Sequence, residues 1–201
     1  MSAFRHSDLA KWQWLWSKMG GRGDDAAWHH RLVAAYGEPQ RHYHNRQHLE
    51  ECLAELQLHR VLAERAEFVA AAIWFHDAVY DPKSATNEED SAALAVACLT
   101  GAGVAAVDVA AVRSLILCTK THETAGVPDA ALLLDIDLAI LGQPGERFWE
   151  YEVAIRQSTP GCRRRRFAPS GRRSCGSFSS GRSFTRPRPF APATKPRPGL
   201  T

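Results

Sequence analysis

The chain has 201 residues, of which 45% are hydrophobic and 9% aromatic, enough for one globular domain with a substantial core. No segment contains the ~20 consecutive apolar residues that a membrane helix requires, and the first residues lack the basic-then-apolar layout of a secretory signal. These features argue against a membrane protein and predict a cytoplasmic one.

The net charge of +3 averages two segments of opposite character. Residues 1–157 contain 14 basic and 22 acidic residues, a net charge of −8, whereas residues 158–201 contain 11 basic residues and no acidic one. The second segment is rich in serine, proline, glycine and arginine, and it cannot bury enough apolar surface to offset chain entropy. We therefore predict a folded domain over residues 1–157 and a disordered basic tail over residues 158–201.

The folded part shows helical periodicity throughout and no strand-like alternation, which predicts an all-α helical bundle. The apolar run VAAAIWFHDAVY is hydrophobic nearly all round and predicts a central, buried helix. Asn45 and Asn87 are the expected N-caps of two other helices. The remaining helices are expected over residues 12–19, 25–36, 104–122, 128–142 and 146–156.

Side chains that commonly bind metals lie in the most apolar of these helices. Asp77 directly follows the apolar triplet IWF, and Asp137 has leucine and isoleucine neighbours at helical spacing. A buried carboxylate costs several kcal/mol unless it is paired or bound to a cation, and basic residues nearby are few. His48 and His76 add imidazoles, and this ligand mixture suits a divalent Mn, Mg, Fe, Ni or Zn ion.

The order His48, His76-Asp77, Asp137 resembles that of the HD superfamily of metal-dependent phosphohydrolases. The segments RHYHNRQHLEECL, AAIWFHDAVYDP, TNEEDSAALA and LLLDIDLAILG are similar, in this order, to a bacterial group of predicted HD hydrolases of unassigned substrate. The resemblance covers roughly residues 12–157. It implies an HD-like bundle, a metal held by these four residues, and hydrolysis of a small phosphomonoester such as a nucleotide.

Two of the four metal positions have competitors nearby. His44 lies one turn before His48 but precedes the expected N-cap, so we assign it to the surroundings of the site. Asp135 and Asp137 differ by about 200° around a helix, so both cannot face one metal. We choose Asp137 because its apolar neighbours are bulkier.

The resemblance also implies catalytic roles for Asp77, Glu88 and His122. Asp77 would accept a hydrogen bond from the attacking water, Glu88 would orient that water, and His122 would contact phosphate or a second metal. On residue type alone, Glu88 is an acid in a helical first turn and His122 a partner for a helix C-terminus. Both interpretations of each residue remain open.

Other functions are compatible with these residues. The domain could bind a nucleotide as a non-catalytic regulatory module, or it could be a dinuclear-metal oxygenase. The arginine-rich tail alone suggests nucleic-acid binding, which we do not favour. Three basic residues of the domain could contact phosphate, although a solvated surface role is the simpler interpretation for each: Arg41, Lys120 and Arg156.

We predict that residues from about Ser158 onward arise from a frameshift, because the resemblance stops at Gln157 and the composition then becomes that of GC-rich DNA read in another frame. Translating the two other frames beyond codon 157 tests this, and one frame should continue with amphipathic, helix-forming sequence. Only stop codons and low-complexity sequence in both frames would contradict the prediction and favour a basic arm that binds nucleic acid or an acidic partner.

Overall fold

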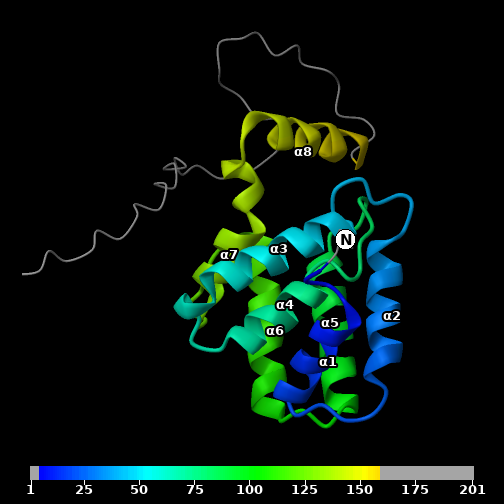
Figure 1. Ribbon diagram of the computed structural model, residues 1–201, viewed down its shortest axis with the longest axis vertical. Helices are drawn as coiled ribbons and strands as arrows, with labels where there is room; N and C mark the ends of the chain where they lie inside the picture. Colours follow the sequence, from blue (N-terminus) through cyan, green and yellow to red (C-terminus); the bar gives the residue numbers. More distant parts are fainter. Residues whose placement is uncertain (1–4, 159–201) are drawn as a thin grey trace, which may run out of the picture. The chain divides into compact units, whose positions relative to one another are not determined.

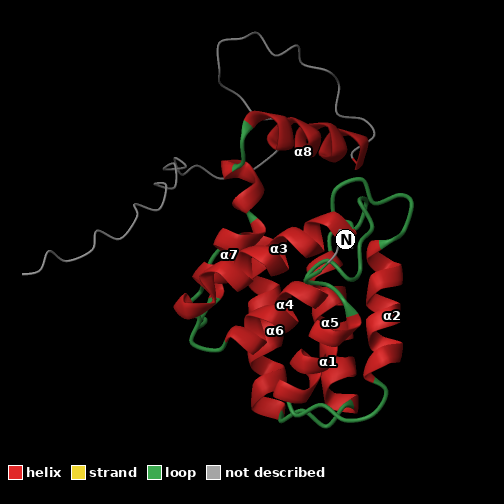
Figure 2. Cartoon of the chain, viewed as in Figure 1, coloured by secondary structure: helices red, strands yellow, loops and turns green. Residues whose placement is uncertain are grey.

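A computed structural model describes residues 5–158, and all its regular elements in that range are helical (Figures 1 and 2). This confirms the all-α class, and the predicted tail lies outside the described residues except for Ser158. Within the described range no helix is both long and apolar enough to cross a bilayer. The elements are α1 (Leu9–Lys18), α2 (Asp25–Tyr36), α3 (Arg46–His59), η1 (Arg60–Leu62), α4 (Ala66–Phe75), α5 (Asn87–Gly101), α6 (Ala106–Thr121), α7 (Ala130–Asp137), η2 (Ala139–Gly142) and α8 (Gly145–Ser158), where η denotes a 3-10 helix.

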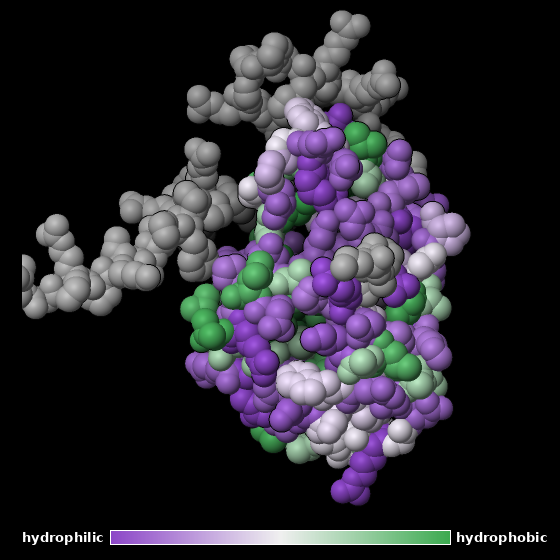
Figure 3. Space-filling view, in the orientation of Figure 1, coloured by the Kyte–Doolittle hydropathy of each residue, from purple (hydrophilic) through white to green (hydrophobic). Residues whose placement is uncertain are grey.

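The central element is α4, which packs against α1, α3, α5, α6 and α7. Its residues from Ala71 to Phe75 are all buried, as expected for a segment that is apolar on every side. Trp12 of α1 lies edge-on to Trp74 at a ring distance of 5.0 Å, and its indole donates a hydrogen bond to the backbone carbonyl of Asp25. The apolar residues thus gather around α4, and the face shown in Figure 3 is mainly hydrophilic.

Of the two predicted N-cap residues, one is confirmed and the other is wrong. Asn45 caps α3 as predicted, because its side-chain oxygen accepts from the backbone N–H groups of Gln47 and His48. The prediction for Asn87 is wrong, since Asn87 is the first residue of α5 and Thr86 is the N-cap. The Asn87 amide instead bonds to both the N–H and the carbonyl of Asp81, and so fixes the loop that follows α4.

Asp129 links the start of α7 to the start of α4. Its backbone is left-handed, with φ of 61°, and its two carboxylate oxygens accept from the N–H groups of Glu64 and Arg65 at 2.8 Å each. Arg65 is the N-cap residue of α4 and offers no side-chain cap of its own. A carboxylate from a distant segment therefore satisfies the free amides ahead of the central helix.

Helix α8 lies at one end of the bundle, beyond α3 and α7 (Figure 1). The Arg147 guanidinium forms two 2.8 Å hydrogen bonds to the carboxylate of Glu51 on α3, and the ring of Tyr151 lies 4.6 Å from that of Tyr43. The helix includes Ser158, which is buried, so it runs one residue past the predicted domain boundary.

We expect Asp129→Ala to lower the free energy of unfolding by about 2 kcal/mol. About half of this is the lost cap, and the rest is the cost of a left-handed alanine. Asp129→Asn should lose less, since asparagine tolerates this conformation and keeps one acceptor. Urea denaturation measures both changes, and equal losses for Asp129→Ala and the exposed control Asp135→Ala would contradict the capping role.

Candidate metal centre

Four side chains from two helices and the turn after α4 approach one another closely. His48 comes from the first turn of α3, His76 and Asp77 follow the last residue of α4, and Asp137 ends α7. The Nε2 atoms of the two histidines are 3.1 Å apart. Asp137 Oδ1 lies 3.2 Å from Nε2 of His48 and 3.4 Å from that of His76, and Asp77 Oδ2 lies 3.5 Å and 3.1 Å from the same atoms.

The ring of His76 is oriented by the backbone. Its Nδ1 lies 2.8 Å from the carbonyl oxygen of Ile73, which can only accept, so Nδ1 carries a proton. In the neutral ring, Nε2 then presents a lone pair toward the other imidazole and the two carboxylates. Histidines that bind metals are commonly oriented by such a hydrogen bond from their other ring nitrogen. His48, His76 and Asp137 form a cluster that could hold a metal ion, and Asp77 borders it.

The cluster has a strong electrostatic demand for a cation. Burial opposes ionisation of Asp77 and Asp137, yet the neighbouring imidazoles outweigh it and lower the pKa of both carboxyls. Burial likewise opposes protonation of His76, but the two carboxylates outweigh it and raise the pKa of that imidazole. Within the described range no lysine or arginine forms an ion pair with either aspartate. A proton or a metal ion must therefore supply the positive charge.

Arg41 holds the turn that carries Asp77. Its guanidinium donates to the backbone carbonyls of Asp77 at 2.5 Å, Ala78 at 3.1 Å and His44 at 3.3 Å, and its Nε donates to Glu38. Only 5% of Arg41 is exposed. The interpretation of Arg41 as a phosphate contact or a solvated surface residue is therefore wrong, because its donors are used inside the protein to position the ligand turn.

The competing residues lie outside the cluster. Asp135 is exposed, on another side of α7 from Asp137. The His44 ring lies 5.9 Å from that of His48, and its Nδ1 is buried with no hydrogen-bond partner in the described part of the chain. Burial lowers the pKa of His44, which disfavours protonation of this imidazole. It lies beside the cluster without contributing a ligand atom.

Besides Asp77, two residues were expected to be catalytic, and only one of them lies near the cluster. His122 ends α6 in a left-handed conformation, and its Nε2 lies 3.9 Å from Asp137 Oδ2, the carboxylate oxygen other than the one facing the histidines. Glu88 is partly buried in the first turn of α5, and no hydrogen bond or ion pair between described residues joins it to the cluster. Of the two, His122 is brought to the site.

The two other basic candidates already have acidic partners. Lys120 donates to the carbonyl of Ala85 at 2.8 Å and pairs with Glu89. Arg156 pairs with Glu152 one turn earlier on α8. Both are surface ion pairs, in line with the simpler interpretation of these residues.

A cavity of about 160 Å³ adjoins the cluster. Its walls come from α3, the end of α7, η2 and α8, and they include the ligands His48 and Asp137. Sequence reasoning gave no role to two other lining residues, Tyr43 and Arg147, because they come from a loop and from a helix whose placement depends on tertiary contacts. The full lining is Tyr43, His48, Glu51, Cys52, Ala54, Glu55, Ile136, Asp137, Ala139, Ile140, Gln143 and Arg147.

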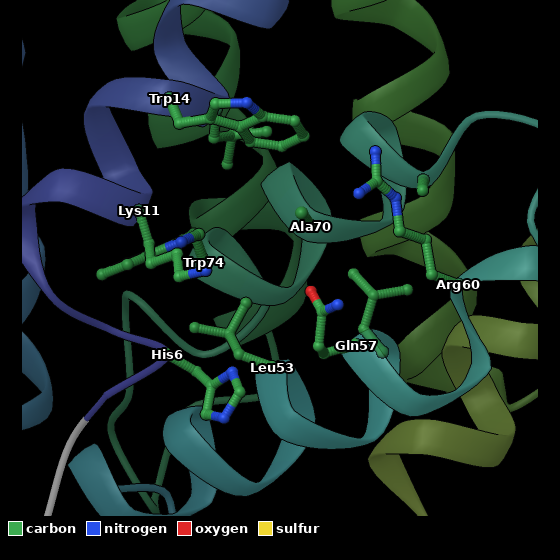
Figure 4. A pocket seen from close by; sticks show the side chains of 11 residues that line it. His6, Lys11, Trp14, Leu53, Gln57, Arg60, Ala70 and Trp74 are labelled. Atoms are coloured by element: carbon green, nitrogen blue, oxygen red, sulfur yellow. The ribbon is translucent and has the colours of Figure 1, made fainter.

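A separate pocket lies between α1, α3, η1 and α4 (Figure 4). Its walls are largely apolar, with Leu53 and Trp74 among them, and Lys11 and Arg60 stand at its edge. None of the cluster residues lines it, so it is distinct from the candidate metal centre.

No protein-family model matches the chain, and comparisons with curated proteins and with solved structures give no match either.

We predict that purified protein binds about one equivalent of a divalent transition metal, and that His76→Ala and Asp137→Asn each remove most of it while the helical content stays unchanged. His76→Ala deletes a nitrogen that the structure directs at the cluster, and Asp137→Asn removes the negative charge of a carboxylate there. Inductively coupled plasma mass spectrometry after dialysis gives the metal content, and circular dichroism the helical content. Asp135→Asn is the matched control, and a greater loss of metal in that variant than in Asp137→Asn would contradict the assignment.

Proposed function

We propose that the chain is a metal-dependent phosphohydrolase of the HD type, which releases phosphate from a small phosphomonoester. The observation that carries this proposal is the buried meeting point of two imidazole nitrogens and two carboxylate oxygens, with all donor-atom distances given above between 3.1 and 3.5 Å. The order of these residues along the chain, which resembles that of HD phosphohydrolases, supports the same reaction.

The donor set fits a divalent cation. Two neutral imidazoles and two carboxylates match the ligand preferences of first-row transition metals and leave coordination positions for water and substrate. When bound, such a cation lowers the pKa of water and offsets negative charge on a phosphoryl group. His48, His76 and Asp137 would hold it, and the hydrogen bond from His76 to Ile73 would fix one ligand before the substrate arrives.

Asp77 has a second role in this proposal. Its side chain is 18% exposed, against 2% for His48 and 3% for His76, so part of the carboxylate can contact a water molecule. Its lowered pKa keeps it ionised near neutral pH and able to accept a hydrogen bond from the attacking water. Arg41 would position it by holding its backbone carbonyl.

His122 is the residue best placed to contact the phosphoryl group. Its side chain is 39% exposed and lies on the other side of the Asp137 carboxylate from the two histidines. A protonated or neutral imidazole there can donate to a phosphoryl oxygen. Glu88 would need a bridging water or a substrate to act at the cluster, and it remains a secondary candidate.

Phosphate release from p-nitrophenyl phosphate and from a panel of phosphomonoesters, with Mn²⁺, Mg²⁺, Ni²⁺, Fe²⁺ or Zn²⁺ added, tests the proposal. We expect metal-dependent turnover that EDTA abolishes, and a loss of at least about 100-fold in Asp77→Asn, since changing even a residue that only hydrogen-bonds to a metal ligand costs ~10–100-fold.

Asp135→Asn serves as the control and should keep wild-type turnover, because this carboxylate is exposed and outside the cluster. Metal-loaded, folded protein that releases no phosphate from any ester would contradict a phosphohydrolase and leave a non-catalytic metal-binding domain.

A further inference from the structure

We propose that the leaving group of the substrate is a compact, uncharged, hydroxyl-bearing alcohol of about three to five carbons, held in the cavity between α3, η2 and α8. This inference rests on the proposed function, because it assigns the cavity beside the metal ligands to the part of the ester that departs from phosphorus. It narrows the substrate from phosphomonoesters in general to small polyol or sugar phosphates.

The position and size of the cavity give the first argument. His48 and Asp137 form part of its wall, so a group bound there is adjacent to an ester held at the cluster. The cavity volume of about 160 Å³ equals that of roughly five liquid waters. It is well below the ~300–1,000 Å³ typical of pockets that enclose drug-sized molecules, so a compact leaving group fits it better than a nucleoside does. A glycerol or pentose unit is of the right order.

The charge of the wall gives the second argument. Arg147 is the one arginine or lysine among the described residues that line the cavity, and its Nε and Nη2 are both bound to Glu51. Its Nη1 donates to Glu150 at 3.3 Å, so its charge is already compensated. Glu55, whose carboxylate lies 3.5 Å from Nε2 of His59, adds a further acidic group with no lysine or arginine beside it among the described residues. A second anionic group on the substrate would therefore meet net negative potential, whereas an uncharged group would not.

The polar atoms of the wall give the third argument. The carboxylate of Glu55 can accept hydrogen bonds, and the amide of Gln143 can accept and donate them. Ile136 and Ile140 supply apolar surface for carbon atoms. Hydroxyl groups, which both donate and accept, match this wall better than a purely hydrocarbon alcohol.

The test uses the full chain, loaded with the metal that best supports hydrolysis of p-nitrophenyl phosphate. Three phosphate esters with three-carbon leaving groups are compared. Glycerol 3-phosphate carries hydroxyl groups, 3-phosphoglycerate adds a carboxylate, and n-propyl phosphate has no hydroxyl group. Ribose 5-phosphate and AMP isolate size. We expect kcat/KM for glycerol 3-phosphate to exceed those for 3-phosphoglycerate and for n-propyl phosphate by at least about tenfold, and ribose 5-phosphate to exceed AMP by a similar factor.

Glu55→Gln links the preference to the cavity, since it removes one negative charge and keeps the side-chain shape. The ratio of kcat/KM between glycerol 3-phosphate and 3-phosphoglycerate should fall by at least about threefold in this variant. Glu64→Gln changes an exposed acid that does not line the cavity, and should leave the ratio unchanged.

The leaving-group inference would be overturned if the protein hydrolyses p-nitrophenyl phosphate but kcat/KM is equal or reversed both among the three-carbon esters and between ribose 5-phosphate and AMP. The proposed function would then stand. An unchanged ratio in folded Glu55→Gln would also overturn it. Metal-loaded protein that hydrolyses none of the esters, p-nitrophenyl phosphate included, would overturn the phosphohydrolase proposal and this inference with it.

Discussion

Two carboxylates and two imidazoles share a largely buried space where α3, the end of α4 and the end of α7 meet, and their mutual electrostatics set what the surrounding helices must hold in place. Each aspartate would be costly to bury alone, and each histidine would be costly to protonate alone. Their proximity raises the pKa of His76 and lowers those of Asp77 and Asp137, the directions that retain a positive charge beside the two carboxylates. A divalent cation meets that demand with better geometry than a proton, because it can contact all the converging donor atoms at once.

The surrounding helices are arranged so that the donor atoms can meet. α4 delivers His76 and Asp77 at its end because it is fixed along its length by packing on all sides and at its start by the Asp129 carboxylate. The turn after it is held by Arg41 through backbone carbonyls, which leaves the ligand side chains free of that arginine. The Asn45 cap fixes the first turn of α3 and with it His48. Backbone anchoring thus does the positioning, and the side chains remain available for chemistry.

The expected metal ligands were assigned through the resemblance to HD phosphohydrolases, and the structure brings His48, His76 and Asp137 together. Local patterns along the chain were sufficient for the helical class, the central place of α4 and the Asn45 cap. Each depends on short-range periodicity or on residue type. The Asn87 cap was predicted wrongly because the asparagine side chain finds partners in the loop around Asp81, a competition that propensity does not capture. The role of Arg41 and the placement of α8 depend on contacts 36 and 96 residues apart, and no local signal announces them. The cavity under α8 is likewise a product of tertiary packing.

The most direct test of a metal centre is anomalous diffraction from crystals of the protein grown with Zn²⁺, recorded above and below the zinc absorption edge. The account predicts one dominant anomalous peak about 2.0–2.2 Å from Nε2 of His48, Nε2 of His76 and a carboxylate oxygen of Asp137, with Asp77 completing the protein ligands. A dominant peak coordinated by other residues, or the absence of any peak beside these four side chains, would contradict it.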